Sequence, residues 1–195
     1  MLRSLITNNC HGWVLYRQFG WKYESPTIAL QILPEEFAKF CANLRHYLES
    51  ELVEYTELSE DHKKYFWHMY GYDLKCPIGL LDDIMVVFQH DESFASAAEK
   101  WNRRKERVNY ENVAYMLHVQ KTSYGECIDE FLRMKLPHSV VITENFDYPG
   151  AYRFDVPEGC DCFNVIGNHK LIEDNFSIAE WLEIENKKAV AAWLK

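Results

Sequence analysis

The 195-residue sequence has no apolar run that approaches the length needed to cross a membrane, which is about 18–20 residues for a helix. It also lacks a glycine-rich phosphate loop of the Walker or dinucleotide type and a serine nucleophile elbow, which disfavours nucleoside triphosphate hydrolysis and nicotinamide redox chemistry. Basic residues are fewer than acidic ones, 21 against 30, and the net charge is −9. A nucleic acid is therefore not an expected partner, because it would need a broad cationic surface.

A secretory signal is also missing from the first residues, because the apolar run there is short and no small-residue cleavage pattern follows it. We therefore expect a cytoplasmic protein whose six cysteines stay reduced. Cys160 and Cys162 are close enough to supply half of a metal site, but no second pair at zinc-binding spacing accompanies them, so no metal centre is predicted. The length and the 48% hydrophobic content fit one globular domain over residues 1–195.

Strand-like and helix-like segments alternate along the chain without a repeat or a break in composition. The strand-like segments that the pattern predicts are 2–6, 26–33, 84–88, 113–119 and 139–143. The helix-like segments are 13–21, 34–48, 94–108, 124–134 and a last one from the capping box Ser177/Glu180 to Trp193. Residues 53–69 are predicted as a hairpin, and residues 146–167 as irregular chain or a short edge hairpin. The alternation predicts an α/β fold with one three-layer (α/β/α), Rossmann-like domain and a mostly parallel or mixed sheet.

Polar side chains follow three of the predicted strands, at the point where each strand ends. They are Asn8, Asn9, Cys10, His11 and Gly12 after the first strand, His90 and Asp91 after the third, and Glu144 after the fifth. In an open α/β sheet, ligands bind at the carboxyl ends of parallel strands. The residues that we predict to line one end of the sheet are Asn8, Cys10, His90, Asp91 and Glu144.

Cys10 is the candidate nucleophile, because a helix N-terminus or a nearby imidazole stabilises a thiolate. The candidate bases are His11, His90 and His169. His90 and Glu144 occupy positions that α/β enzymes use for catalytic acid and base groups. The residues predicted to bind substrate beside them are Asn8, Asn9, His11, Gly12 and Asp91. The alternative is structural: Cys10 packs in a tight turn, the asparagines cap a helix and His90 is a loop residue.

A basic side is predicted on the helix that follows His90, where the following residues fall together: Lys100, Arg103, Arg104 and Arg107. The three arginines are predicted to hold a phosphate or a carboxylate, since guanidinium groups offer bidentate hydrogen bonds. The alternative is a solvated helix face with ordinary ion pairs. Aromatic residues make up 15% of the chain, and any exposed ones would suit stacking on a sugar ring, whereas most would form the core.

Four segments carry a resemblance to a known family: ITNNCHG at 6–12, YESPT at 23–27, AEKWNRRKERVN at 98–109 and FSIAEWL at 176–182. In this order they resemble an uncharacterised bacterial family whose members are labelled exopolysaccharide or capsule biosynthesis proteins. The resemblance implies an α/β fold and an association with surface-polysaccharide synthesis, but it offers no catalytic residues to carry over. The NCHG stretch is also similar to the Asn-Cys-Gln opening of proteins that handle acyl groups on polysaccharides, with His in place of Gln and no preceding Gly.

The sequence as a whole predicts a small transferase of acyl or glycosyl type that acts on a sugar-containing substrate in exopolysaccharide or capsule synthesis. In this interpretation residues 7–12 bind the reacting group, His90 or Glu144 moves a proton, and the arginines hold an anionic part of the substrate. The alternative is a non-catalytic accessory protein that binds a glycan or a partner enzyme. The sequence requires no cofactor, although a sugar nucleotide or an acyl-coenzyme A would be a suitable donor. It leaves the oligomeric state open.

Overall fold

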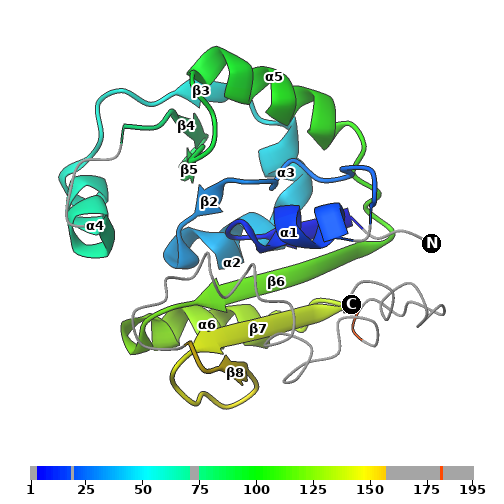
Figure 1. Cartoon of the computed structure of the whole chain (residues 1–195), viewed down its shortest axis with the longest axis vertical. Helices are drawn as coiled ribbons and strands as arrows, with labels where there is room; N and C mark the ends of the chain where they lie inside the picture. Colours follow the sequence, from blue (N-terminus) through cyan, green and yellow to red (C-terminus); the bar gives the residue numbers. More distant parts are fainter. Residues whose placement is uncertain (1–3, 19, 71–74, 157–180, 182–195) are drawn as a thin grey trace.

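The structure is a computed structural model that describes residues 4–18, 20–70, 75–156 and 181. It contains a parallel sheet of order β1-β6-β7-β8 and a separate antiparallel sheet of order β2-β5-β4-β3, with four strands each (Figure 1). The strands of the parallel sheet are β1 (Ser4–Thr7), β6 (Val113–Val119), β7 (Ser139–Glu144) and β8 (Tyr152–Phe154). Those of the antiparallel sheet are β2 (Gln31–Ile32), β5 (Ile84–Val87), β4 (Ile78–Leu81) and β3 (Leu52–Glu54).

The helices connect and cover these sheets. They are α1 (His11–Gln18), α2 (Pro34–Ala42), α3 (Leu44–Glu49), α4 (Glu60–Tyr70), α5 (Phe94–Lys105), the short 3-10 helix η1 (Thr122–Tyr124) and α6 (Gly125–Arg133). Helix α2 packs against β5, β6 and α6, so it joins the two sheets. In Figure 1, α5 lies on the side of the antiparallel sheet, whereas α6 lies beside β6 and β7.

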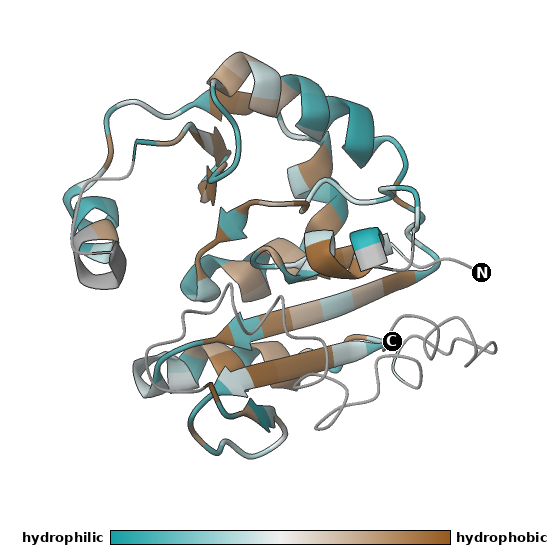
Figure 2. Ribbon diagram, viewed as in Figure 1, coloured by the Kyte–Doolittle hydropathy of each residue, from teal (hydrophilic) through white to brown (hydrophobic). Residues whose placement is uncertain are grey.

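The parallel sheet is buried on both faces, which explains the continuous apolar runs of its strands. All seven residues of β6 are buried, and Figure 2 shows the hydrophobic character of β6 and β7. On one face, Leu5, Met116 and Ile142 pack with Leu15 and Tyr16 of α1. The other face belongs to a larger core that reaches both sheets, and the largest fully buried side chains of this core are Phe37, Phe40, Trp101 and Phe131.

The α/β class is confirmed, but the strands form two sheets where the sequence predicted a single one. Strand β5 pairs antiparallel with both β4 and β2. Only Asp82 and Asp83 connect β4 to β5, and so short a connection permits antiparallel pairing alone. Asp82 has a φ of 56°, which is typical of such tight hairpin turns. The three-layer, Rossmann-like arrangement and the single domain over residues 1–195 remain predictions.

The hairpin predicted over residues 53–69 is wrong, because the chain after Ser59 forms helix α4. The Ser59 hydroxyl oxygen accepts a hydrogen bond from the backbone N–H of His62 at 3.2 Å, which caps the helix start. Glu60 and Asp61 occupy the first turn, where negative charge suits the helix dipole. The polar stretch that indicated a turn is therefore the beginning of a helix.

Of the strand predicted over residues 26–33, only the part that forms β2 is extended and paired. The Ser25 hydroxyl accepts a hydrogen bond from the N–H of Thr27 at 3.1 Å, and Ala29 has a φ of 59°. These residues form a turn that carries the chain past α1 before β2 begins.

Two helical predictions have other outcomes. The helix predicted over residues 34–48 divides at Asn43 into α2 and α3, and the helix predicted from Ser177 to Trp193 lies outside the described residues. Also outside them are Cys160, Cys162 and His169. Within the described ranges, no helix is long and apolar enough to cross a membrane.

Candidate functional site

The carboxyl ends of β1, β6 and β7 lie at one edge of the parallel sheet, and Asn8 links the first two. Its side-chain oxygen accepts a hydrogen bond from the backbone N–H of His118 at 2.8 Å. Its side-chain nitrogen donates to the carbonyl of His118 at 3.0 Å. This pair of bonds continues the β1–β6 ladder beyond the last residue of β1, and Asn8 is only 2% exposed. Asn8 therefore fixes the start of the loop rather than facing a ligand.

His118 forms the centre of a buried polar network at this edge. Its Nε2 lies 2.8 Å from Oε1 of Glu144, and its Nδ1 contacts the side-chain nitrogen of Asn9. The side-chain oxygen of Asn9 accepts from the backbone N–H of His11 at 3.1 Å. Because a backbone N–H can only donate, the Asn9 oxygen must face His11 and the Asn9 amide nitrogen must face His118. With Nδ1 facing the Asn9 amide nitrogen, the proton of the neutral His118 ring is on Nε2, which lies within ion-pair distance of Glu144 but outside hydrogen-bond geometry.

His11 completes this network from the first residue of α1. Its Nδ1 lies 3.1 Å from the Asn9 oxygen, so Nδ1 carries the proton and Nε2 presents a lone pair. Within the described residues, Nε2 of His11 has no hydrogen-bond partner. Burial lowers the pKa of His11 well below its usual value, and the neighbouring His118 lowers it further. The His11 ring is therefore neutral where the network is intact.

This burial of His11 predicts how stability depends on pH. The unfolded chain binds the His11 proton as the pH falls through about 6.5, whereas the folded chain does not, so the free energy of unfolding should decrease toward acid pH. In the His11→Asn variant, whose side-chain nitrogen can replace Nδ1, urea unfolding at pH 5 to 8 should show a flatter profile. Below about pH 6.5, the difference between the unfolding free energies of the two proteins should change by up to about 1.4 kcal/mol per pH unit.

Other titrating groups cancel in this comparison because both proteins contain them. Glu36 is one of these groups, since burial raises its pKa to about 7. Profiles that run parallel between pH 5 and pH 8 would show that His11 binds its proton equally in the folded and unfolded chains.

Cys10 lies between this network and the antiparallel sheet. Its carbonyl accepts from the N–H of Val14 at 3.2 Å, so Cys10 directly precedes the first turn of α1. Its Sγ lies 3.4 Å from Nε2 of His90 and 3.7 Å from the side-chain oxygen of Gln89. The Gln89 nitrogen in turn donates to the Gln31 oxygen at 2.8 Å. The loops after β1 and β5 thus bring a thiol and an imidazole together from two different sheets.

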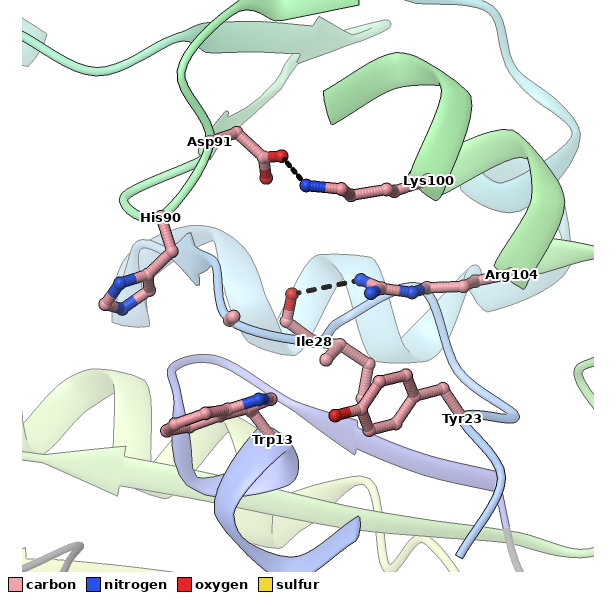
Figure 3. Close-up of a pocket in the computed structure, with 8 residues that line it drawn as sticks. Trp13, Tyr23, Ile28, His90, Asp91, Lys100 and Arg104 are labelled. Carbon is pink, nitrogen blue, oxygen red and sulfur yellow. Dashed lines mark hydrogen bonds and ion pairs between the residues drawn. The ribbon is translucent and has the colours of Figure 1, made fainter. Parts of the chain in front are cut away.

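A pocket of about 250 Å³ opens beside His90 (Figure 3). Its lining residues are Trp13, Tyr23, Ile28, Ala29, His90, Asp91, Lys100 and Arg104. The ring of Trp13 is stacked near His90 with centroids 6.4 Å apart, and the Lys100 ammonium forms an ion pair with Asp91. Lys100 and Arg104 reach from α5 toward the centre of the pocket (Figure 3). The pocket therefore combines aromatic faces, two cations and an imidazole.

The three predicted anion-binding arginines have different positions. Arg104 lines the pocket, but Arg103 pairs with Glu99 at 3.1 Å and its side chain is 54% exposed. Arg107 donates to the backbone carbonyl of Tyr23 at 3.1 Å and so holds the 23–27 segment against α5. The solvated-face alternative thus describes Arg103, and Arg104 is the arginine that faces the pocket.

Gly12 and Glu144 are also placed away from the pocket lining. A Cβ on Gly12 would lie 2.7 Å from Oγ1 of Thr7 and 3.2 Å from the Thr27 carbonyl oxygen, so Gly12 permits α1 to pack closely on β1. The Glu144 side chain is only 10% exposed and faces His118.

The predicted residues therefore form two groups. His90, Asp91 and Arg104 line the pocket, whereas Asn8, Asn9, His11 and Glu144 belong to the buried network around His118, which the sequence did not predict. Cys10 lies between the two groups.

The sequence prediction missed His118 and Gln89. His118 is the histidine of the mainly apolar strand β6. A histidine one residue before the end of a strand is the signal that could have identified it, because polar side chains near carboxyl strand ends face the same edge as the loops.

These features define an α/β protein with a cysteine–histidine pair beside a small cationic and aromatic pocket. The chain belongs to the family described as "Domain of unknown function (DUF1919)", which matches residues 3–183. It is also similar to an "Uncharacterized protein" of Haemophilus influenzae, with 24% identity over 186 residues that cover 91% of this chain and 82% of the relative. Neither description mentions a reaction or polysaccharide synthesis, so the function has to be argued from the site.

Proposed function

We propose that this protein is a small acyltransferase that uses Cys10 as its nucleophile and a sugar-containing molecule as its acceptor. The observation that carries the proposal is the 3.4 Å separation between Cys10 Sγ and His90 Nε2. His90 also lines the pocket, so a group bound there lies next to the base. A thiol in contact with an imidazole is the usual arrangement for nucleophilic acyl transfer.

The reaction runs in two halves. His90 Nε2 takes the thiol proton while Cys10 Sγ attacks the acyl carbonyl of an activated donor such as an acyl thioester, and the leaving group departs with that proton. The acyl group is then held on Cys10 as a thioester. In the second half, His90 takes the proton of an acceptor hydroxyl, the oxygen attacks the thioester carbonyl, and the proton returns to the Cys10 thiolate.

Acyl transfer fits the pocket better than glycosyl chemistry that relies on a pair of carboxylates. Such chemistry places two carboxylates on either side of the glycosidic bond. Among the described lining residues, Asp91 is the single carboxylate, and it is paired with Lys100. Glu144 is buried against His118 instead. The association with exopolysaccharide or capsule synthesis rests on the resemblance of the sequence motifs.

One observation favours a second candidate, a non-catalytic accessory protein that binds a glycan or a partner enzyme. Cys10 is only 3% exposed and does not itself line the pocket. Acylation therefore requires the residues around Cys10 to move enough to admit the acyl group while His90 stays in contact with the thiol. A protein that only binds sugars would need no such movement.

The two candidates are separated by a screen for ligands followed by product analysis. A thermal-shift screen with acetyl-coenzyme A, sugar nucleotides, sugar phosphates and acidic sugars would identify ligands, because binding to the folded state raises the melting temperature. With a stabilising donor and acceptor, we expect mass spectrometry to show an acetylated sugar that Cys76→Ser still forms and Cys10→Ser does not. Stabilisation by sugars without any acetylated product would favour the accessory protein.

A further inference from the structure

We infer that the pocket beside His90 binds a single sugar ring that carries a phosphate group, and that Arg104 and Lys100 hold this phosphate. The inference deepens the proposed function, because it names the chemical class of the acceptor. It rests on the proposed function only in assigning the sugar phosphate the role of acceptor. The charges, partners and size of the pocket support the binding by themselves.

Arg104 is a half-buried cation that lacks a matching anion. The guanidinium group contacts the carbonyl oxygen of Ile28 at 3.5 Å and the face of the Tyr23 ring, 5.1 Å from the guanidinium carbon. Within the described part of the chain, Arg104 forms no ion pair with a carboxylate. Partial burial lowers the pKa of Arg104, as do Arg103 and Arg107, whereas Tyr23 and Asp91 partly offset this by raising it. A cation held in this way is stabilised when an anion binds next to it.

The second cation of the pocket is only partly neutralised. Lys100 pairs with Asp91, whose side chain is 9% exposed, so the two cations and one carboxylate leave one positive charge. A phosphate has three oxygens, enough to accept from the guanidinium and from the ammonium together. A carboxylate has two oxygens in one plane, which match a single arginine fork better than two cations on separate side chains. The pair of cations therefore fits a phosphate monoester better than a carboxylate.

The size and the apolar side of the pocket indicate what the phosphate is attached to. The volume of about 250 Å³ lies below the roughly 300–1,000 Å³ of pockets that hold larger ligands. Trp13, Tyr23 and Ile28 supply aromatic and aliphatic surface beside the cations (Figure 3), and such surface suits the flat apolar face of a sugar ring. A sugar phosphate fits within this space, whereas a complete sugar nucleotide would extend beyond it.

The test uses calorimetric titration with glucose 1-phosphate as the probe, in the Cys10→Ser protein and without an acyl donor. We expect binding to weaken about 10-fold or more in Arg104→Gln and in Lys100→Gln, the usual consequence of removing a charge-assisted hydrogen bond. Arg103→Gln is the matched control, because Arg103 is the neighbouring arginine of the same helix and pairs with Glu99. Its affinity should stay within about twofold of the parent protein, as for other surface substitutions.

Further probes decide the ligand class. Glucose, glucuronate and UDP-glucose should each bind more weakly than glucose 1-phosphate. The inference is overturned if glucuronate or UDP-glucose binds more tightly, or if Arg104→Gln and Arg103→Gln behave alike. Arg104→Lys keeps a positive charge near Tyr23, so its affinity should lie between those of the parent protein and of Arg104→Gln. This variant tests the inference even where the glutamine substitution disturbs folding. Because no acyl group moves in these titrations, a failure of the proposed transfer reaction leaves their result unchanged.

Discussion

Replacement of His90 by alanine should slow the release of p-nitrophenolate from p-nitrophenyl acetate by about 10²–10⁴-fold, the range for loss of a positioned acid–base group. The reason is the 3.4 Å contact between its Nε2 and Cys10 Sγ: without the imidazole, the thiol keeps its proton and attacks slowly. The release is followed by absorbance in stopped flow, with the Cys10→Ser protein as the background rate.

A matched control separates the catalytic effect of His90 from the general effect of removing a histidine. His46 lies on α3 and contacts Asp82 at 3.1 Å, with 59% of its side chain exposed. His46→Ala should release p-nitrophenolate at the rate of the parent protein. The affinity of His90→Ala for glucose 1-phosphate should change far less than its rate, because His90 forms only one side of the pocket. A His90→Ala protein that keeps the parent rate would remove His90 from the mechanism.

The second large effect concerns stability. Replacement of His118 by leucine should lower the free energy of unfolding by about 3 kcal/mol, because it removes the neutral imidazole beside a buried carboxyl group and leaves polar groups of the network unsatisfied. The carboxyl group is that of Glu144, which also contacts the side chain of Gln120 at 3.5 Å. The Asn9 amide also loses its acceptor on His118. Urea unfolding at pH 7 measures the loss.

Glu144→Gln provides the comparison for this prediction. Glutamine keeps the size of the side chain and an oxygen beside His118 Nε2, which makes no hydrogen bond in the described part of the chain, so this variant should lose only about 1 kcal/mol. The double variant His118→Leu, Glu144→Leu should be less destabilised than the sum of the single leucine variants, since no charge remains to be buried. Equal losses in His118→Leu and Glu144→Gln would show that the network does not hold an ionised carboxylate.

The sequence allowed the polar edge of the parallel sheet to be predicted because strand direction alone determines it. The apolar runs of β1 and β7 identified parallel strands, and parallel strands place the residues after them at the same edge. Cys10 and His90 were expected to line the same end of a single sheet, but their contact was not predicted. Strand β5 belongs to the antiparallel sheet, and the contact depends on how α2 and the shared core bring the two sheets together.

Other features depended on interactions that a pattern of apolar residues does not contain. Helix α4 was missed because its aromatic residues favour strands, whereas the Ser59 cap and the acidic first turn favour a helix. The differing positions of Arg103 and Arg104 were also not predictable. Both fall on one side of α5, and only the packing of the 23–27 segment determines which of them faces the pocket.

The central claim is that Cys10 is the nucleophile, and the most direct measurement is the location of the acyl group during turnover. The parent protein would be mixed with p-nitrophenyl acetate, quenched in acid within the first turnover, digested and mapped by mass spectrometry. We expect the acetyl group on Cys10, and its loss from that position in His90→Ala. An acetyl group found on another residue, such as the half-buried Cys76, with Cys10 unmodified would contradict the account.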